Sequence, residues 1–181
     1  MAITKIQSES MNLADTYAFT GTVTGAGGGK VLQVVQATKN DVFSTTSTSY
    51  VDVTGLSVDI TPASTSNKVL VICNIGKSSN SSDGGTMYQL VRGSTSIYDS
   101  NTGGNADDAF GTAGGGGMSD NGRKNDYGLM TYIDSPSSTS AQTYKLRMKV
   151  TSNTGYINRW AMNNDQSGVT SITLMEIAGW L

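Results

Sequence analysis

The feature that most constrains the fold is a succession of short segments rich in β-branched residues, separated by clusters of Ser, Gly, Asn and Asp. No long stretch keeps the 3.6-residue period of an amphipathic helix. The pattern predicts an all-β chain, folded as an antiparallel β-sandwich or jelly roll. The candidate strands are residues 31–37, 41–45, 49–60, 68–76, 86–92, 95–99, 126–134, 142–151, 155–162 and 169–179.

The chain divides into an N-terminal arm (1–24), a glycine-rich hinge (25–29) and a sandwich domain, or knob (30–181). Glycine is useful at a hinge because it adopts many backbone conformations. The arm carries apolar residues that a lone chain has little to cover with, which makes them candidates for anchoring it on a partner or on sister chains: Ile3, Ile6, Met11, Leu13, Tyr17 and Phe19. The alternative is a disordered leader.

Composition excludes several kinds of chemistry. The 181 residues include no His and one Cys, so imidazole catalysis, a disulfide within the chain and a Cys or His zinc site are ruled out. Twelve basic against 14 acidic residues argue against a nucleic-acid binder, and no apolar run has the length of a membrane helix. The N-terminus also lacks a signal-peptide pattern. We therefore expect a non-enzymatic protein without cofactor, metal site, nucleic-acid partner or membrane insertion.

The predicted strands are of two kinds. Residues 144–150 alternate between apolar and basic, as in a strand with one face on a core and one in water. Residues 69–73 and 172–177 are apolar, or nearly so, on both faces. One face can pack on the core of the sandwich, and the apolar side chains of the other face then need something else to shield them from water. A closed homo-oligomer supplies this cover, and the alternative is cover by loops of the same chain. The interface candidates are Val69, Val71, Ile72, Leu174 and Ile177.

The sequence contains only weak matches to the motifs of catalytic or ligand-binding sites. The run at 25–31 lacks the first Gly and the final Ser or Thr of a phosphate-binding loop, which favours a linker. The pair Asp107 and Asp108 is compatible with a catalytic carboxylate pair or a Ca²⁺ site, but its Gly-rich surroundings favour a solvated loop. Lys145, Arg147 and Lys149 could meet an anionic polysaccharide, although an ordinary solvated strand face is the favoured interpretation.

The long Gly-rich stretch 99–126 has two interpretations. It is either a variable tip that meets a host glycan or a plain surface loop, and the sequence favours neither. In the first case Tyr98 or Phe110 would stack on sugar, and Asp107 and Asp108 would face the host with them.

Four segments resemble structural proteins of marine tailed bacteriophages: IQSESMNLADTYAFTGTVTG at 6–25, KVLQVVQA at 30–37, QLVRGST at 89–95 and TLMEIA at 173–178. The resemblance implies a homotrimeric jelly-roll knob of the tumour-necrosis-factor-like kind, located in the virion. It also implies that the doubly apolar strands surround the threefold axis and that 144–150 lies in the outer sheet.

By this resemblance the expected function is that of a virion structural protein, attached through its arm to other proteins of the capsid or tail. It would be a capsid decoration protein, a head fibre or a short tail fibre. The alternative is a carbohydrate-binding tip for host adsorption.

Overall fold

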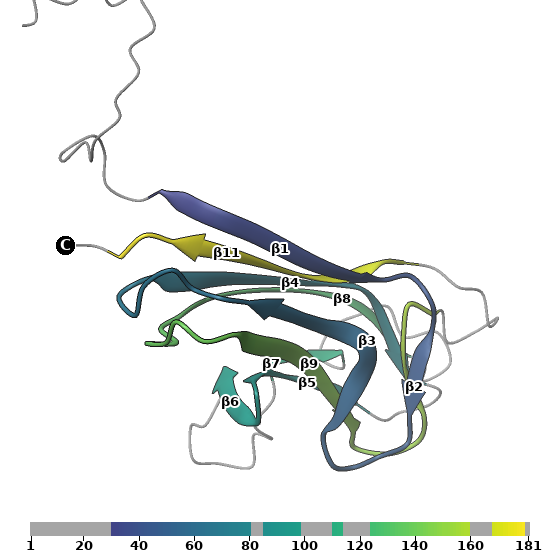
Figure 1. The fold of residues 1–181 in the computed structure, drawn as a ribbon. Helices are drawn as coiled ribbons and strands as arrows, with labels where there is room; N and C mark the ends of the chain where they lie inside the picture. Colours follow the sequence, from purple (N-terminus) through teal and green to yellow (C-terminus); the bar gives the residue numbers. More distant parts are fainter. Residues whose placement is uncertain (1–29, 81–84, 99–109, 114–123, 160–167, 180–181) are drawn as a thin grey trace, which may run out of the picture.

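The computed structural model describes residues 30–80, 85–98, 110–113, 124–159 and 168–179 (Figure 1). The predicted arm and hinge lie outside the described residues, as do Asp107 and Asp108. Within the described part, the chain consists of strands joined by turns and loops, and no helix is present there. The turn-rich, β-branched sequence accounts for this all-β structure.

The described part of the chain contains eleven strands, numbered in chain order. They are β1 (Val31–Lys39), β2 (Phe43–Thr45), β3 (Val51–Ile60), β4 (Lys68–Asn80), β5 (Thr86–Arg92), β6 (Thr95–Tyr98), β7 (Phe110–Ala113), β8 (Lys124–Asp134), β9 (Gln142–Val150), β10 (Gly155–Ile157) and β11 (Thr170–Ile177).

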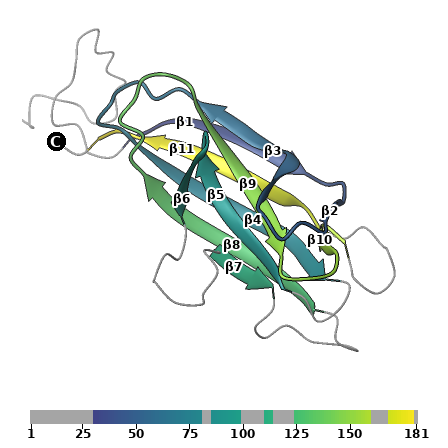
Figure 2. The same cartoon turned by 90° about the horizontal axis from the view of Figure 1, so that it is seen from below.

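The strands form two antiparallel sheets that lie one over the other (Figure 1). In sheet A, the strands β1, β11, β4 and β8 lie side by side, and β10 and β2 extend the sheet beside the end of β4. In sheet B the order is β3, β9, β5, and both β6 and β7 pair with the remaining edge of β5. Seen from below, β7 lies beside β8, where the edges of the two sheets approach each other (Figure 2).

Strands β6 and β7 are two pieces of one interrupted edge strand. β6 pairs with residues 90–92 of β5, and β7 pairs with residues 86–88. If β6 and β7 count as one strand and the short strands β2 and β10 are set aside, eight strands remain. Sheet A then contains β1, β11, β4 and β8 in spatial order, and sheet B contains β3, β9, β5 and the interrupted strand β6/β7. Renumbered from 1 to 8 along the chain, these orders are 1-8-3-6 and 2-7-4-5. This double Greek-key order is that of a jelly roll, which confirms the predicted fold class.

Two strand predictions need correction. β7 was missed, because four residues with a central Gly carry little strand signal and are held by their pairing with β5. The strand expected at 155–162 ends at Ile157, because Asn158 has φ 59° and turns the backbone out of the extended conformation.

The core lies between the sheets and follows the period of two. In β9, Tyr144, Leu146, Met148 and Val150 are buried, as their alternation predicts. The facing side chains come from β4 and β11 of sheet A. In β3, residues 53–56 form an irregular bulge opposite the single residue Leu146, and Gly55 within it has a φ of +83°, a conformation that favours glycine.

Candidate interaction surface

The outer face of sheet A carries a row of apolar side chains across four strands. The register pairs Val34 of β1 with Met175 of β11, Met175 with Leu70 of β4, and Leu70 with Ile133 of β8. Neighbouring strands are about 4.8 Å apart, so the row runs for roughly 14 Å. Directly paired residues point to the same side of a sheet, so these four side chains form one continuous strip.

Three further apolar residues widen this strip into what we call the apolar patch. Ile177 follows Met175 on the same side of β11 and pairs with Val31, and Ile72 follows Leu70 on β4. Several members are strongly exposed: Ile133 by 58%, Val31 by 55% and Val34 by 54%. The apolar patch is therefore Val31, Val34, Leu70, Ile72, Ile133, Met175 and Ile177.

The other end of the same face is largely polar. Beyond the patch the outward residues include Gln36, Thr173 and Thr131, and the Gln36 Nε2 donates a hydrogen bond to the Thr173 Oγ1 at 2.7 Å. The next row is Thr38, Ser171, Asn74 and Leu129, with Leu129 its one apolar member. The apolar patch therefore lies at the end where the chain enters β1 and leaves β11.

The structure corrects part of the predicted interface. Val69, Val71 and Leu174 have 0% exposure and lie in the core of the one chain, so they cannot contact a second copy and the prediction for them was wrong. Ile72 and Ile177 do lie on the outer face. The reason is the alternation of a strand, since residues one position apart face opposite sides.

The members of the apolar patch missed by sequence reasoning are Leu70 and Met175 in the doubly apolar strands, and Val31, Val34 and Ile133 in the two strands that flank them. The signal for Leu70 and Met175 was present, because they are the alternate positions of the same runs.

A buried carboxylate lies directly beneath the patch. Glu176 points inward between the outward Met175 and Ile177, and it is 1% exposed. Its carboxylate accepts hydrogen bonds from the Asn67 Nδ2 at 2.5 Å, the Gln33 Nε2 at 2.6 Å and the Ala63 backbone N–H at 2.7 Å. Glu176 therefore ties the beginning of β1 and the turn before β4 to the end of β11.

The donors determine the charge state of Glu176. Burial alone raises the pKa of this carboxyl, but the hydrogen bonds from Gln33, Asn67 and Ala63 outweigh burial and lower the pKa below its ordinary value of 4.5. The Asn67 side chain is itself oriented, because its Oδ1 accepts a hydrogen bond from the Gly179 N–H at 2.9 Å. The site thus holds an ionised carboxylate among neutral donors.

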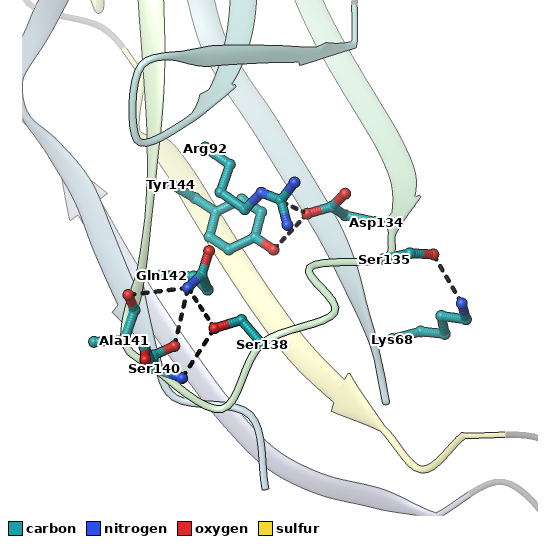
Figure 3. Close-up of polar contacts among 9 residues, drawn as sticks. All are labelled: Lys68, Arg92, Asp134, Ser135, Ser138, Ser140, Ala141, Gln142 and Tyr144. Carbon is teal, nitrogen blue, oxygen red and sulfur yellow. Dashed lines mark hydrogen bonds and ion pairs between the residues drawn. The ribbon is translucent and has the colours of Figure 1, made fainter. Parts of the chain in front are cut away.

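A second polar cluster lies where β5 and β8 end and β9 begins (Figure 3). The Tyr144 hydroxyl donates to the Asp134 Oδ2 at 2.7 Å, and the Arg92 Nε lies 3.4 Å from the same oxygen. Burial, and then the hydrogen bond to Asp134, raise the pKa of Tyr144, so this hydroxyl stays protonated. The cluster neutralises a buried carboxylate and joins the two sheets, and we assign it no chemistry.

The outward side chains of β9 in sheet B are basic. The Lys145 Nζ lies 2.6 Å and the Arg147 Nε 3.0 Å from the carboxylate of Asp52, and the Lys149 Nζ lies 4.8 Å from the centre of the Tyr50 ring. The hydrogen bond from Lys145 is the main cause that lowers the pKa of Asp52. Two of the three basic residues considered as a polysaccharide contact, the less favoured interpretation, are thus already paired with an acid.

The predicted host-facing residues are only partly described. Tyr98 is a half-buried strand residue of β6 rather than part of a loop, and its ring lies 5.1 Å from that of Tyr132. Phe110 begins β7, which corrects its assignment to a loop, while Asp107 and Asp108 lie outside the described residues.

The described residues show no group of three or more Cys, Asp or Glu side chains that could hold a metal ion. Burial raises the pKa of the Cys73 thiol to about 12, so it is unreactive at neutral pH. A helix of the length and hydropathy needed to span a membrane is absent from the described part of the chain. No protein-family model and no curated protein matches the chain.

Proposed function

We propose that the chain is a non-enzymatic structural protein of a bacteriophage particle, a jelly-roll knob that assembles as a homotrimer through the outer face of sheet A. Its N-terminal arm attaches the knob to capsid or tail proteins. The observation that carries self-assembly is the row of Val34, Met175, Leu70 and Ile133 across that face.

Energetics support an occupant for this face. Full burial of a Val, Leu or Ile side chain contributes about 1.5–3 kcal/mol. Val31, Val34 and Ile133 are each more than half exposed in the single chain, so covering them offers a large part of the free energy that a stable assembly requires.

Charge supports a second copy as that occupant. Among the described outward residues of β1, β11, β4 and β8 near the patch, Lys68 is the charged one, and its Nζ donates to the Ser135 Oγ at 2.8 Å. A second copy can therefore cover this face without strong like-charge repulsion, and a closed symmetric arrangement leaves no such face exposed. The assignment to a phage particle rests on the resemblance of the four sequence segments to phage structural proteins.

A specific observation favours a second candidate function, the receptor- or carbohydrate-binding tip. The edge strand of sheet B is interrupted between Tyr98 and Phe110, whose partners Leu90 and Tyr88 are only two residues apart in β5. An insertion that leaves and re-enters one edge strand is a natural place for variable sequence. If residues 99–109 are needed for host adsorption and the arm is dispensable for particle attachment, binding is the primary role.

Native mass spectrometry of the full chain at micromolar concentration tests the proposed function. The expected species contains three chains, and a clean monomer would contradict the assembly. A density map of an intact particle then decides its location: we expect the knob at a threefold position on the particle, and absence from the particle would overturn the virion role.

A further inference from the structure

The apolar patch lies where the preceding chain reaches the sandwich. The carbonyl oxygen of Lys30 accepts a hydrogen bond from the Ala178 N–H at 2.9 Å, and Val31, the first residue of β1, is itself part of the patch. The pairing of β1 with β11 therefore keeps the backbone extended up to Lys30. The 29 residues that precede Lys30 start from the border of the patch.

The nearest part of those residues has a pattern that suits the patch. In residues 17–24 (YAFTGTVT), Tyr17, Phe19 and Val23 occupy three of the four alternate positions, the remaining one being a glycine, and the segment contains no charged residue. In an extended backbone these three side chains project to one side, because residues two positions apart face the same way. Such residues are separated by about 6.6 Å along the strand. Leu70 and Ile72 on β4 repeat at the same spacing on the outer face.

We propose that residues 17–24 of one copy lie across the apolar patch of the next copy, so that exchanged arms close the assembly. This inference rests on the proposed self-assembly and names the segment that covers the face. The backbone is paired with β11 up to Lys30, so the direction of β1 points away from the patch of its own copy. An arm that keeps this direction reaches a neighbouring copy, whereas cover of its own patch needs a reversal within the glycine-rich residues 25–29, which is the alternative that the test decides. The arrangement leaves Ile3, Ile6, Met11 and Leu13 free to bind the particle.

Cross-linking of the full chain tests this exchange. The variant carries Thr20→Cys in the arm and Thr131→Cys beside Ile133 and Ile72 on the outer face of sheet A, joined by a short bis-maleimide. The native Cys73 is buried, so we expect it not to react with the cross-linker. We expect covalent dimers and trimers on a denaturing gel. The matched control, Thr20→Cys with the exposed Ser57→Cys of sheet B, is expected to remain monomeric.

A second comparison uses the alternation within the arm. Phe19→Ser with Val23→Ser removes the apolar side of residues 17–24, and we expect the dissociation constant of the assembly to rise at least tenfold. Thr20→Ser with Thr22→Ser changes the opposite side of the same segment and is expected to alter the constant less than twofold. Analytical ultracentrifugation of the full-length variants measures both.

The outcomes separate the two proposals. Cross-links confined within single chains, equal cross-linking of the control pair, or an unchanged dissociation constant for the Phe19 and Val23 variant would overturn arm exchange, even with the assembly intact. A monomeric unmodified chain would instead overturn the proposed self-assembly, and arm exchange with it.

Discussion

The two outer faces of the jelly roll differ sharply although the same alternation builds both. On sheet B, the outward residues of β9 are Lys145, Arg147 and Lys149, and Asp52 of β3 pairs with the first two. On sheet A, the corresponding outward row is apolar and crosses four strands. The outward residues of β9 therefore indicate contact with water, whereas we propose that the apolar outward row of sheet A contacts another polypeptide.

The largest expected effect separates the inner from the outer side of sheet A. Leu174→Ala removes a fully buried side chain, and we expect it to lower the free energy of unfolding by about 2–5 kcal/mol. Leu70→Ala, one strand away but on the outer face, should cost clearly less. Urea unfolding measures both, in an Ile133→Asp background chosen to weaken the proposed assembly. Equal losses would show that the two sides of the sheet are not distinct.

The next prediction tests the outer face of sheet A directly. Ile133→Asp places a charge in the apolar row at a position that is 58% exposed in one chain, so we expect it to leave the fold intact and to disturb the proposed assembly. We expect self-association to weaken by about 100-fold, which corresponds to about 3 kcal/mol. Ser57→Asp on sheet B is the matched control. Sedimentation equilibrium decides, and equal effects of the two variants would remove the special status of sheet A.

A smaller effect is expected at the buried carboxylate under the patch. Glu176→Gln turns an amide toward three N–H donors, and we expect a loss of about 1–3 kcal/mol in unfolding free energy at pH 7. Urea unfolding of the two proteins at pH 7 measures the loss.

The same pair of proteins tests the pH dependence. The folded-state pKa of Glu176 lies below its ordinary value of 4.5, so below pH 4.5 the unfolded chain binds more protons than the folded one. The contribution of Glu176 is complete above pH 4.5 and is lost as the pH falls through the folded pKa. The difference between wild type and variant should therefore shrink in acid, and a difference independent of pH would contradict this account.

The smallest effect belongs to sheet B. Asp52→Asn removes the partner of Lys145 and Arg147, but the Asp52 side chain is 46% exposed and solvent screens the pairs. We expect less than about 1 kcal/mol, diminishing further with added salt. Urea unfolding at low and high salt measures it. A loss as large as that of Glu176→Gln would mean that the ion pairs of sheet B are more than a solvated surface.

The sequence predicted the positions of most strands, because turn clusters bound them and their period is two. It also placed the inward side of β9 correctly, since Tyr144 and Leu146 alternate with charged residues. It could not choose the inward side of residues 69–73, because a run that is apolar in both phases fits either orientation. The partner strands decide, and they lie far away in the chain.

The polar support of the patch was equally beyond local reasoning. Glu176 interrupts an apolar run and looks like an ordinary outward residue, yet it points inward. Its donors Gln33 and Asn67 lie more than 100 residues away in sequence, with separations of 143 and 109. Contacts at such separations follow from the topology of the jelly roll rather than from any local pattern.

The most direct measurement of the central claim is hydroxyl-radical footprinting of the full chain at concentrations below and above its association midpoint. We predict that labelling of Ile133 and Met175 on sheet A falls strongly as the chain assembles, while labelling of Tyr50, beside Lys149 of sheet B, stays constant. Labelling of Ile133 and Met175 that remains unchanged across the transition would contradict the claim that a second copy covers the outer face of sheet A.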